Sequence, residues 1–247
     1  MTDKTDNIYQ KAFDKVSDFR FDSGVVEVFE DMIERSVPGY AAILGMTGEL
    51  ATQFAQPHTA IYDLGCSLGG SSISIAQRTL PQGVRIQALD NSIAMVEGLN
   101  NKLATDAFKQ MPIDLSCEDI CATPFKPNSF VVMNFTLQFI QPDLRDQLIN
   151  KIYDSLVPGG ALLLSEKIKF EDPKVDQLIV DLHHQFKKSM GYSDLEIAQK
   201  RSAIENILLP ETSQTHFERM NKAGFKQVTT WFQCFNFYSF LAVKGDN

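Results

Sequence analysis

The sequence lacks a continuous apolar run long enough to cross a membrane, and its first residues lack the basic, apolar and small-residue pattern of an export leader. We therefore expect a cytoplasmic protein that does not enter a membrane. Its four cysteines include no Cys-x-x-Cys pair, and its four histidines form no ligand pattern with them. These spacings favour reduced thiols and predict that no metal is bound.

Positive charge is also scarce, because 23 Lys and Arg stand against 31 Asp and Glu, for a net charge of −8. Proteins that bind nucleic acid usually neutralise its phosphates with a basic face. The pairs Lys187-Lys188 and Lys200-Arg201 are isolated. We therefore expect no direct binding to nucleic acid. With 44% hydrophobic residues among 247, the chain can bury a complete core as one domain.

Apolar strands alternate with amphipathic helices through the middle of the chain. We expect strands at 59–64, 84–89, 112–117, 130–133 and 161–166, and helices at 70–79, at 92–105 and from Pro142 to before Pro158. Strands buried on both faces and joined by helices form a parallel sheet. Two further strands, near 226–232 and 234–243, complete it. The pattern predicts an α/β Rossmann-like fold, with a seven-stranded, mostly parallel sheet and an antiparallel C-terminal strand.

Helical segments flank this alternation. Apolar residues recur at helical spacing from Val25 to Ile33, residues 41–56 form a second expected helix, and the polar, Asp-rich residues 1–22 are expected to be mobile at first. Residues 171–210 predict two consecutive helices, the second beginning at a Ser193–Glu196 capping box. The chain is thus predicted to be a single domain with three parts: an N-terminal helical cap (1–56), a core (57–170 and 211–247) and a helical insertion (171–210).

The first expected strand ends in Asp63 and a glycine-rich turn, and the second ends at Asp90. Glycines let the backbone turn sharply between strand and helix, and the second acid can accept both ribose hydroxyls. Counting from Gly65, a dinucleotide-binding turn would have glycine in third place, where the backbone touches pyrophosphate. Ser67 stands there instead, which favours a nucleoside without phosphates. We predict S-adenosylmethionine rather than NAD, and a tight turn without a ligand is the alternative.

Ligands of such sheets bind beyond the carboxyl ends of the strands. Asp119 is expected to accept from the adenine amino group while Ile120 packs on the ring, and Asn134 is expected near the amino-acid end. Asp119 and Asn134 can equally be turn residues. The residues that this geometry collects around one crevice are Gly65, Cys66, Ser67, Asp90, Asn91, Asp119, Ile120 and Asn134.

Longer motifs carry a more specific signal. Met32-Ile33-Glu34-Arg35-Ser36-Val37-Pro38-Gly39-Tyr40, Asn134-Phe135-Thr136-Leu137-Gln138-Phe139, Lys200-Arg201-Ser202 and Trp231-Phe232-Gln233-Cys234-Phe235-Asn236-Phe237 are the clearest. Together with the glycine turn they resemble the carboxy-S-adenosyl-L-methionine synthase family of the Rossmann-like methyltransferase superfamily, over nearly the whole chain. Matched by motif, the product-binding positions that the resemblance implies are Tyr40, Gly65 to Ser67, Asp90, Asn91, Asp119, Ile120, Asn134 and Arg201.

The resemblance implies a particular reaction. Members of this family convert S-adenosylmethionine and prephenate into carboxy-S-adenosylmethionine and phenylpyruvate, and the product supplies a tRNA carboxymethyltransferase that makes 5-carboxymethoxyuridine at the wobble position. Arg201 would bind the added carboxylate by a charge-assisted contact. No protein base is evident, so no catalytic residue is assigned, and the oxygen leaving prephenate is the expected base. The helices of 171–210 are expected to dock on a second subunit and form a homodimer.

Two other functions share the same cofactor pocket. An ordinary methyltransferase acting on a small molecule or tRNA needs no carboxylate contact, and a non-catalytic subunit of a tRNA-modifying complex needs no prephenate site. Asn134-Phe135-Thr136-Leu137 differs from the Asn-Pro-Pro-aromatic run of enzymes that methylate base amino groups. The ligand released from the purified protein distinguishes a synthase from a methyltransferase.

Overall fold

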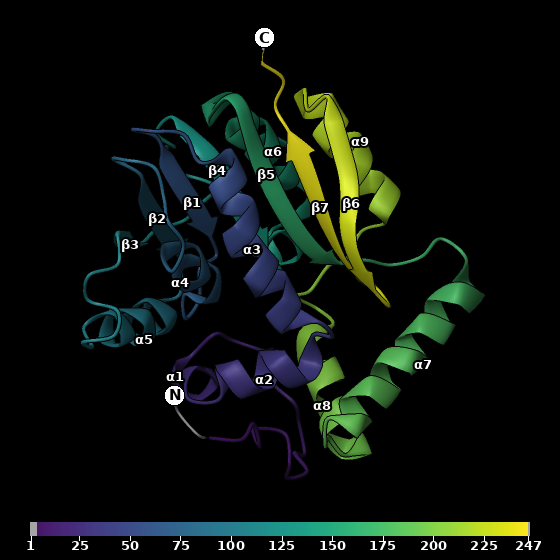
Figure 1. Cartoon of the computed structure of the whole chain (residues 1–247). Helices are drawn as coiled ribbons and strands as arrows, with labels where there is room; N and C mark the ends of the chain where they lie inside the picture. The colour runs from purple at the N-terminus through teal and green to yellow at the C-terminus, as the bar shows by residue number, and fades with distance from the viewer. Residues whose placement is uncertain (1–3, 247) are drawn as a thin grey trace.

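A seven-stranded sheet with helices on both faces forms the body of the protein in the computed structural model, which describes residues 4–246 (Figure 1). The strand order is β3-β2-β1-β4-β5-β7-β6. The strands are β1 (Ala60–Leu64), β2 (Arg85–Asp90), β3 (Ile113–Cys117), β4 (Asn128–Asn134), β5 (Leu156–Lys167), β6 (Gln227–Cys234) and β7 (Phe237–Val243). This sheet confirms the predicted α/β fold.

The strands β1 to β5 are parallel, and only β7 runs against its neighbours. It pairs antiparallel with β5 on one side and with β6 on the other. This confirms the antiparallel C-terminal strand. The carboxyl ends of the five parallel strands therefore share one edge, where ligands of such sheets bind.

Side chains alternate between the two faces of the sheet, as the two-residue period of a strand requires. On β4, Phe130 and Val132 pack toward one face, and Val131 and Met133 pack toward the other. The first face is covered by α3 (Tyr40–Phe54), α4 (Gly70–Ala76) and α5 (Ile93–Leu103), and the second by α6 (Pro142–Ser155) and α9 (Ser213–Ala223).

The remaining helices are α1 (Ser23–Val26), α2 (Phe29–Ser36), the 3-10 turn η1 (Leu137–Phe139), α7 (Pro173–Ser189) and α8 (Asp194–Ile204). In Figure 1, α2, α7 and α8 lie below the sheet. The single helix expected from Val25 to Ile33 is broken in two, because Val28 leaves helical geometry at φ −123° and ψ 4°. Both halves of the expected capping box of α8 are present. No helix found in residues 4–246 has the length and apolarity to span a membrane.

The N-terminal segment from residue 4 to residue 22 contains no helix or strand, yet it is packed rather than loose. Asp6 is buried and accepts a hydrogen bond from the Tyr192 hydroxyl at 2.6 Å. The side-chain amide of Gln199 donates to the carbonyl of Tyr9 at 2.8 Å. These contacts tie the segment to α8 and to the turn that precedes it, in contrast to the expectation of mobility. The first three residues, also part of that expectation, lie outside the described residues.

Candidate active site

A cavity of about 500 Å³ lies between the carboxyl ends of β1, β2 and β4 and the helices α2, α7 and α8. Eight of the ten predicted site residues line it, and Tyr40 and Cys66 are not among its lining residues. The eight are Gly65, Ser67, Asp90, Asn91, Asp119, Ile120, Asn134 and Arg201. The structure therefore brings most of the predicted set to one place, with Arg201 contributed by α8.

The glycine turn after β1 requires glycine for two reasons. Gly65 has φ +79°, and a Cβ there would collide with the Thr136 side chain. Its amide donates to the carbonyl of Leu89 at 2.8 Å, which fixes the turn against the end of β2. A left-handed conformation is costly for other residues. The loop is thus held close to the neighbouring strand.

Asp90 organises the part of the cavity at the ends of β1 and β2. One oxygen accepts from the amide of Ser67 and the other from the amide of Ser92, both at 2.9 Å. Burial raises the pKa of this carboxyl, and the two amides partly offset that rise. Each carboxylate oxygen can accept more than one hydrogen bond. The geometry therefore leaves acceptor capacity on Asp90 for a ribose diol.

Asp63, the acid before the turn, has a structural role. It is buried, and one oxygen accepts from both the amide and the hydroxyl of Ser72, at 2.9 and 2.6 Å. Burial raises its pKa to about 6. Asp63 is not among the residues that line the cavity. It joins the end of β1 to the first turns of α4.

Asn134 and Asp119 make local contacts that constrain their side chains. The Asn134 amide donates to Ser71 Oγ at 2.9 Å, and its oxygen accepts from Ser165 Oγ at 2.6 Å. Asp119 Oδ1 accepts from the amide of Cys121 at 2.8 Å. Asp119 therefore acts in part as a turn residue, which was the alternative interpretation of its position. The predicted contacts of both residues with a ligand stay predictions.

Tyr40 and Cys66 lie behind the loop. The Tyr40 ring packs 6.4 Å from that of Phe135, and its hydroxyl would stand 3.0 Å from a Cβ placed on Gly70. Burial raises the pKa of Tyr40. Cys66 is buried among Ile73, Ala88 and Leu99. Their predicted contact with the product stays a prediction, and Tyr40 is positioned to shape the start of α4.

Six basic side chains line the cavity, and sequence reasoning identified only one of them, Arg201. They come from the end of β5, from α7 and from α8: Lys167, His183, His184, Lys187, Lys200 and Arg201. In the sequence, the pairs Lys187-Lys188 and Lys200-Arg201 have no feature that sets them apart from surface charges. Only the packing of α7 against α8 reveals that Lys187 points into the cavity.

His183 is neutral in this setting. Its Nε2 lies 2.8 Å from the carbonyl oxygen of Ser36, so this nitrogen carries the proton and donates. Burial, with the charge of Lys167 next in importance, lowers the pKa of His183 to about 3. The ring also stands edge-on to Phe237 at 4.9 Å. His183 therefore holds α7 against the end of α2 and the start of β7.

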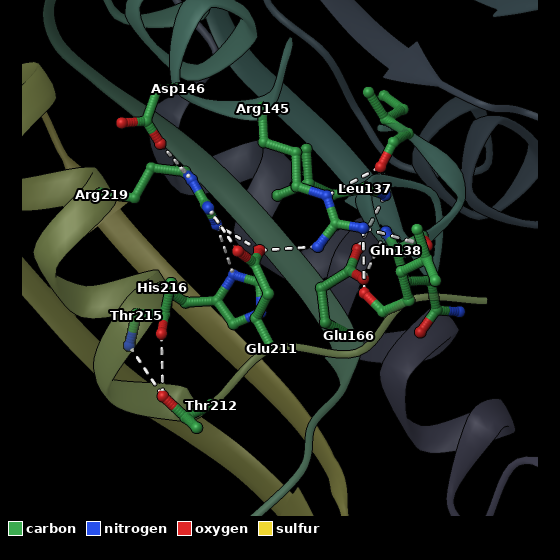
Figure 2. A network of polar contacts seen from close by, with 12 residues as sticks. Leu137, Gln138, Arg145, Asp146, Glu166, Glu211, Thr212, Thr215, His216 and Arg219 are labelled. Carbon is green, nitrogen blue, oxygen red and sulfur yellow. Dashed lines mark hydrogen bonds and ion pairs between the residues drawn. The ribbon is translucent and has the colours of Figure 1, made fainter. Parts of the chain in front are cut away.

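A polar network fixes η1, which forms one wall of the cavity (Figure 2). The buried Glu166 accepts from the backbone amides of Leu137 and Gln138, at 2.9 and 2.8 Å. Burial raises the pKa of Glu166 to about 8. The buried Arg145 donates to the Gln138 carbonyl at 3.2 Å and to Glu211 at 2.7 Å. The wall is therefore tied to β5, α6 and the start of the C-terminal segment.

The network continues toward α9. Arg219 donates to both oxygens of Glu211 and to Asp146, each at 2.8 Å (Figure 2). Burial, and then the neighbouring positive charges, lower the pKa of His216 to about 4. Paired and hydrogen-bonded buried charges of this kind order a structure, because removing one partner leaves the other unpaired. The network gives the cavity wall a rigid support.

The sequence of the chain is also similar to known proteins. A methyltransferase domain model matches residues 61–160. A carboxy-S-adenosyl-L-methionine synthase of Enterobacter sp. (strain 638) is 50% identical over 246 residues, which are 99% of both chains. The synthase of Geobacter sp. (strain M21) is 50% identical over 244 residues, covering 99% of this chain and all of the relative. The chain belongs to the carboxy-S-adenosyl-L-methionine synthase family.

As a carboxy-S-adenosyl-L-methionine synthase, the protein is a transferase that acts on S-adenosylmethionine. Its fold also resembles human N-acetylserotonin methyltransferase in complex with SAM, at a TM-score of 0.60 and 17% identity, over 90% of this chain and 56% of the other. Within residues 4–246, no three His, Cys, Asp or Glu side chains are placed to hold a metal ion. The expectation that the synthase binds no metal stays a prediction.

Proposed function

We propose that this synthase converts S-adenosylmethionine and prephenate into carboxy-S-adenosylmethionine and phenylpyruvate. The main support is that two chemically different sets of residues line this cavity. The ends of β1 and β2 offer the glycine turn and Asp90 for a nucleoside, and β5, α7 and α8 offer cationic side chains for a carboxylate-rich second substrate. A methyltransferase acting on a neutral acceptor has no use for that second feature.

The proposed reaction balances without an added oxidant or reductant. Prephenate loses one carboxyl group as carbon dioxide and its ring hydroxyl as hydroxide, and its ring becomes aromatic. The hydroxide takes a proton from the sulfonium methyl group and forms water. The methylene carbon left behind, stabilised by the adjacent positive sulfur, bonds to carbon dioxide and becomes the carboxymethyl group. No protein base is required.

The chain contributes a water-poor space for this chemistry. Phe135, Phe139 and Phe237 line the cavity together with Ile33 and Val37. Exclusion of water protects a reactive carbanion from protonation and leaves carbon dioxide as the available partner. Arg201, on α8, is the proposed contact for the carboxylate that the product gains.

Two measurements test the proposal. Mass spectrometry of the ligand released from purified protein should give a mass one carbon dioxide above that of S-adenosylmethionine. Incubation with S-adenosylmethionine and prephenate should yield phenylpyruvate and the carboxylated nucleoside in equal amounts. Release of S-adenosylhomocysteine would instead support an ordinary methyltransferase. Binding of S-adenosylmethionine with no turnover of prephenate would support a non-catalytic subunit.

The proposal extends to the use of the product. The carboxylated nucleoside would supply a tRNA carboxymethyltransferase that forms 5-carboxymethoxyuridine at the wobble position, and the synthase itself would not contact the tRNA. The four cysteines are free thiols, which suits a cytoplasmic enzyme. Cells without this synthase should lack the modified nucleoside in digested tRNA, and cells that express an active copy should regain it.

A further inference from the structure

Three cations of the cavity lack an anionic partner among the described residues. They are Lys167 at the end of β5, Lys187 in α7 and Arg201 in α8. Across residues 4–246, their charged groups form neither an ion pair nor a hydrogen bond. Lys200 differs, because its ammonium donates to Ser36 Oγ at 3.0 Å and lies 3.8 Å from Asp6. Lys200 is therefore satisfied by the protein, and the other three are not.

Lys187 is the most unusual of the three, because only 7% of it is exposed. Buried lysines normally pair with an acid, since an isolated buried charge is costly. The closest contact recorded for its ammonium is the Tyr192 ring, whose centroid lies 5.4 Å away. Lys188, the next residue, is exposed and pairs with Asp194 at 2.5 Å. The helix therefore directs one lysine into the cavity and the other toward solvent.

The unpaired cations repel one another. Burial and then the charges of Lys200 and Lys167 lower the pKa of Lys187 to about 7. Burial and the charge of Arg201 likewise lower the pKa of Lys167. The acids Asp6, Glu196 and Asp176 act on these lysines only from beyond ion-pair distance. An anion bound between the lysines would replace repulsion with attraction.

The proposed reaction involves two kinds of carboxylate. The carboxylate that must leave as carbon dioxide gains no rate from a strong contact in the ground state, because such a contact raises the barrier. The carboxylate that prephenate retains in phenylpyruvate carries no such penalty. Cations other than the one that binds the product carboxylate therefore suit the retained group.

We propose that Lys167 and Lys187 form a subsite for the retained carboxylate of the second substrate, which leaves Arg201 for the carboxylate of the product. This inference rests on the proposed function. It assigns substrate-binding roles to two lysines, and it predicts specificity for a carboxyl donor that carries a second carboxylate.

Steady-state kinetics of Lys187→Gln and Lys167→Gln test the subsite, with Lys188→Gln as the matched control on the same helix. Loss of one charge-assisted contact should raise the KM for prephenate about tenfold or more in each of the first two variants. The affinity for S-adenosylmethionine, measured by calorimetry, should stay within about twofold, because neither lysine lies at the ends of β1 and β2. Lys187→Arg should recover part of the lost affinity, and Lys188→Gln should behave as the wild type.

Each other outcome has a definite meaning. Unchanged KM values in both variants, with the wild type converting prephenate, would overturn the subsite and leave the proposed function intact. An equal loss of affinity for S-adenosylmethionine would show a structural role and would also overturn it. A wild type that binds prephenate in calorimetry without converting it would refute the proposed function and retain the subsite. If Lys187→Gln does not fold, Lys167→Gln and Lys187→Arg decide the matter.

Discussion

Asp90 orders the glycine turn that is predicted to contact the ligand. Its two oxygens hold the amides of Ser67 and Ser92, so the glycine turn and the start of α5 are fixed by one carboxylate. The Ser67 side chain turns toward Met95, with Oγ 3.3 Å from Sδ. The part of the cavity at the ends of β1 and β2 is therefore organised by the residues that the sequence motif contains.

Replacing Gly65 by alanine should damage this part of the cavity. The positive φ of +79° costs an alanine about 1–2 kcal/mol, and its Cβ would collide with Thr136. We expect the affinity for S-adenosylmethionine to fall at least about tenfold in calorimetry, as the loop shifts. Gly45→Ala, in α3, is the control, because a Cβ on Gly45 would have no neighbouring atom within 4 Å. It should keep full affinity and gain about 0.5–1 kcal/mol of stability.

Arg201→Ala should separate the product from the substrate. Loss of a charged contact should weaken binding of carboxy-S-adenosylmethionine by about 1.5–3 kcal/mol, while S-adenosylmethionine, which lacks the added carboxylate, should be affected less. Calorimetry with both nucleosides measures the difference. Arg85→Ala, at the opposite end of β2, should change neither affinity. Equal weakening of both ligands would refute the role of Arg201.

Sequence predicted the position of a residue where that position follows from local geometry. Ser67 lies in a turn whose shape follows from its glycines, and Asp90 ends the neighbouring strand β2, so their place in the cavity was predictable. Lys187 offered no such signal, because its burial depends on α7, α8 and the N-terminal segment meeting around Tyr192. No local pattern distinguishes it from the exposed Lys188.

At the scale of elements, the junction of β1 with α4 depends on a buried acid. Asp63 has a pKa of about 6 in the folded protein, against an ordinary value of 3.8. Between about pH 4 and pH 6, the folded state keeps a proton that the unfolded state has lost. Stability contributed by this group therefore falls as the pH rises through that range, by roughly 2–3 kcal/mol.

Asp63→Asn should remove this dependence, because asparagine can still accept from Ser72 and does not titrate. Urea unfolding of both proteins at several values between pH 4 and pH 7 measures the effect. The stability of the variant relative to the wild type should rise with pH across the range. A constant difference between the two proteins would contradict the raised pKa of Asp63.

Sequence periodicity predicted the type and order of the main elements, because strands and helices have different spacings of apolar residues. The expected strand at 112–117 differs from β3 by one residue at its start. The break between α1 and α2 was not predicted, since Val25 and Val28 keep helical spacing and are both buried. Packing against α5, which α1 contacts, overrides the local preference there.

At the scale of the whole molecule, α7 and α8 present apolar side chains to solvent. Leu178 is 57% exposed and Leu195 43% exposed. We expect these helices to dock on a second copy, so light scattering at micromolar concentration should give twice the chain mass of 27.7 kDa. Leu178→Asp should shift the protein to monomers, because a charge would be buried at the interface. Leu144→Asp, at an exposed position of α6, should not.

The antiparallel position of β7 has a consequence for how the sheet is completed. β7, the last strand in the sequence, lies between β5 and β6. β6 therefore has no neighbour in the sheet until residues 237–243 take their place. A shortened chain ending before Phe237 would lose an interior strand rather than an edge. It would expose the backbone of β5 beside Lys167, which pairs with Phe237. The strand that the ribosome synthesises last therefore completes the sheet next to the basic side chains of the cavity.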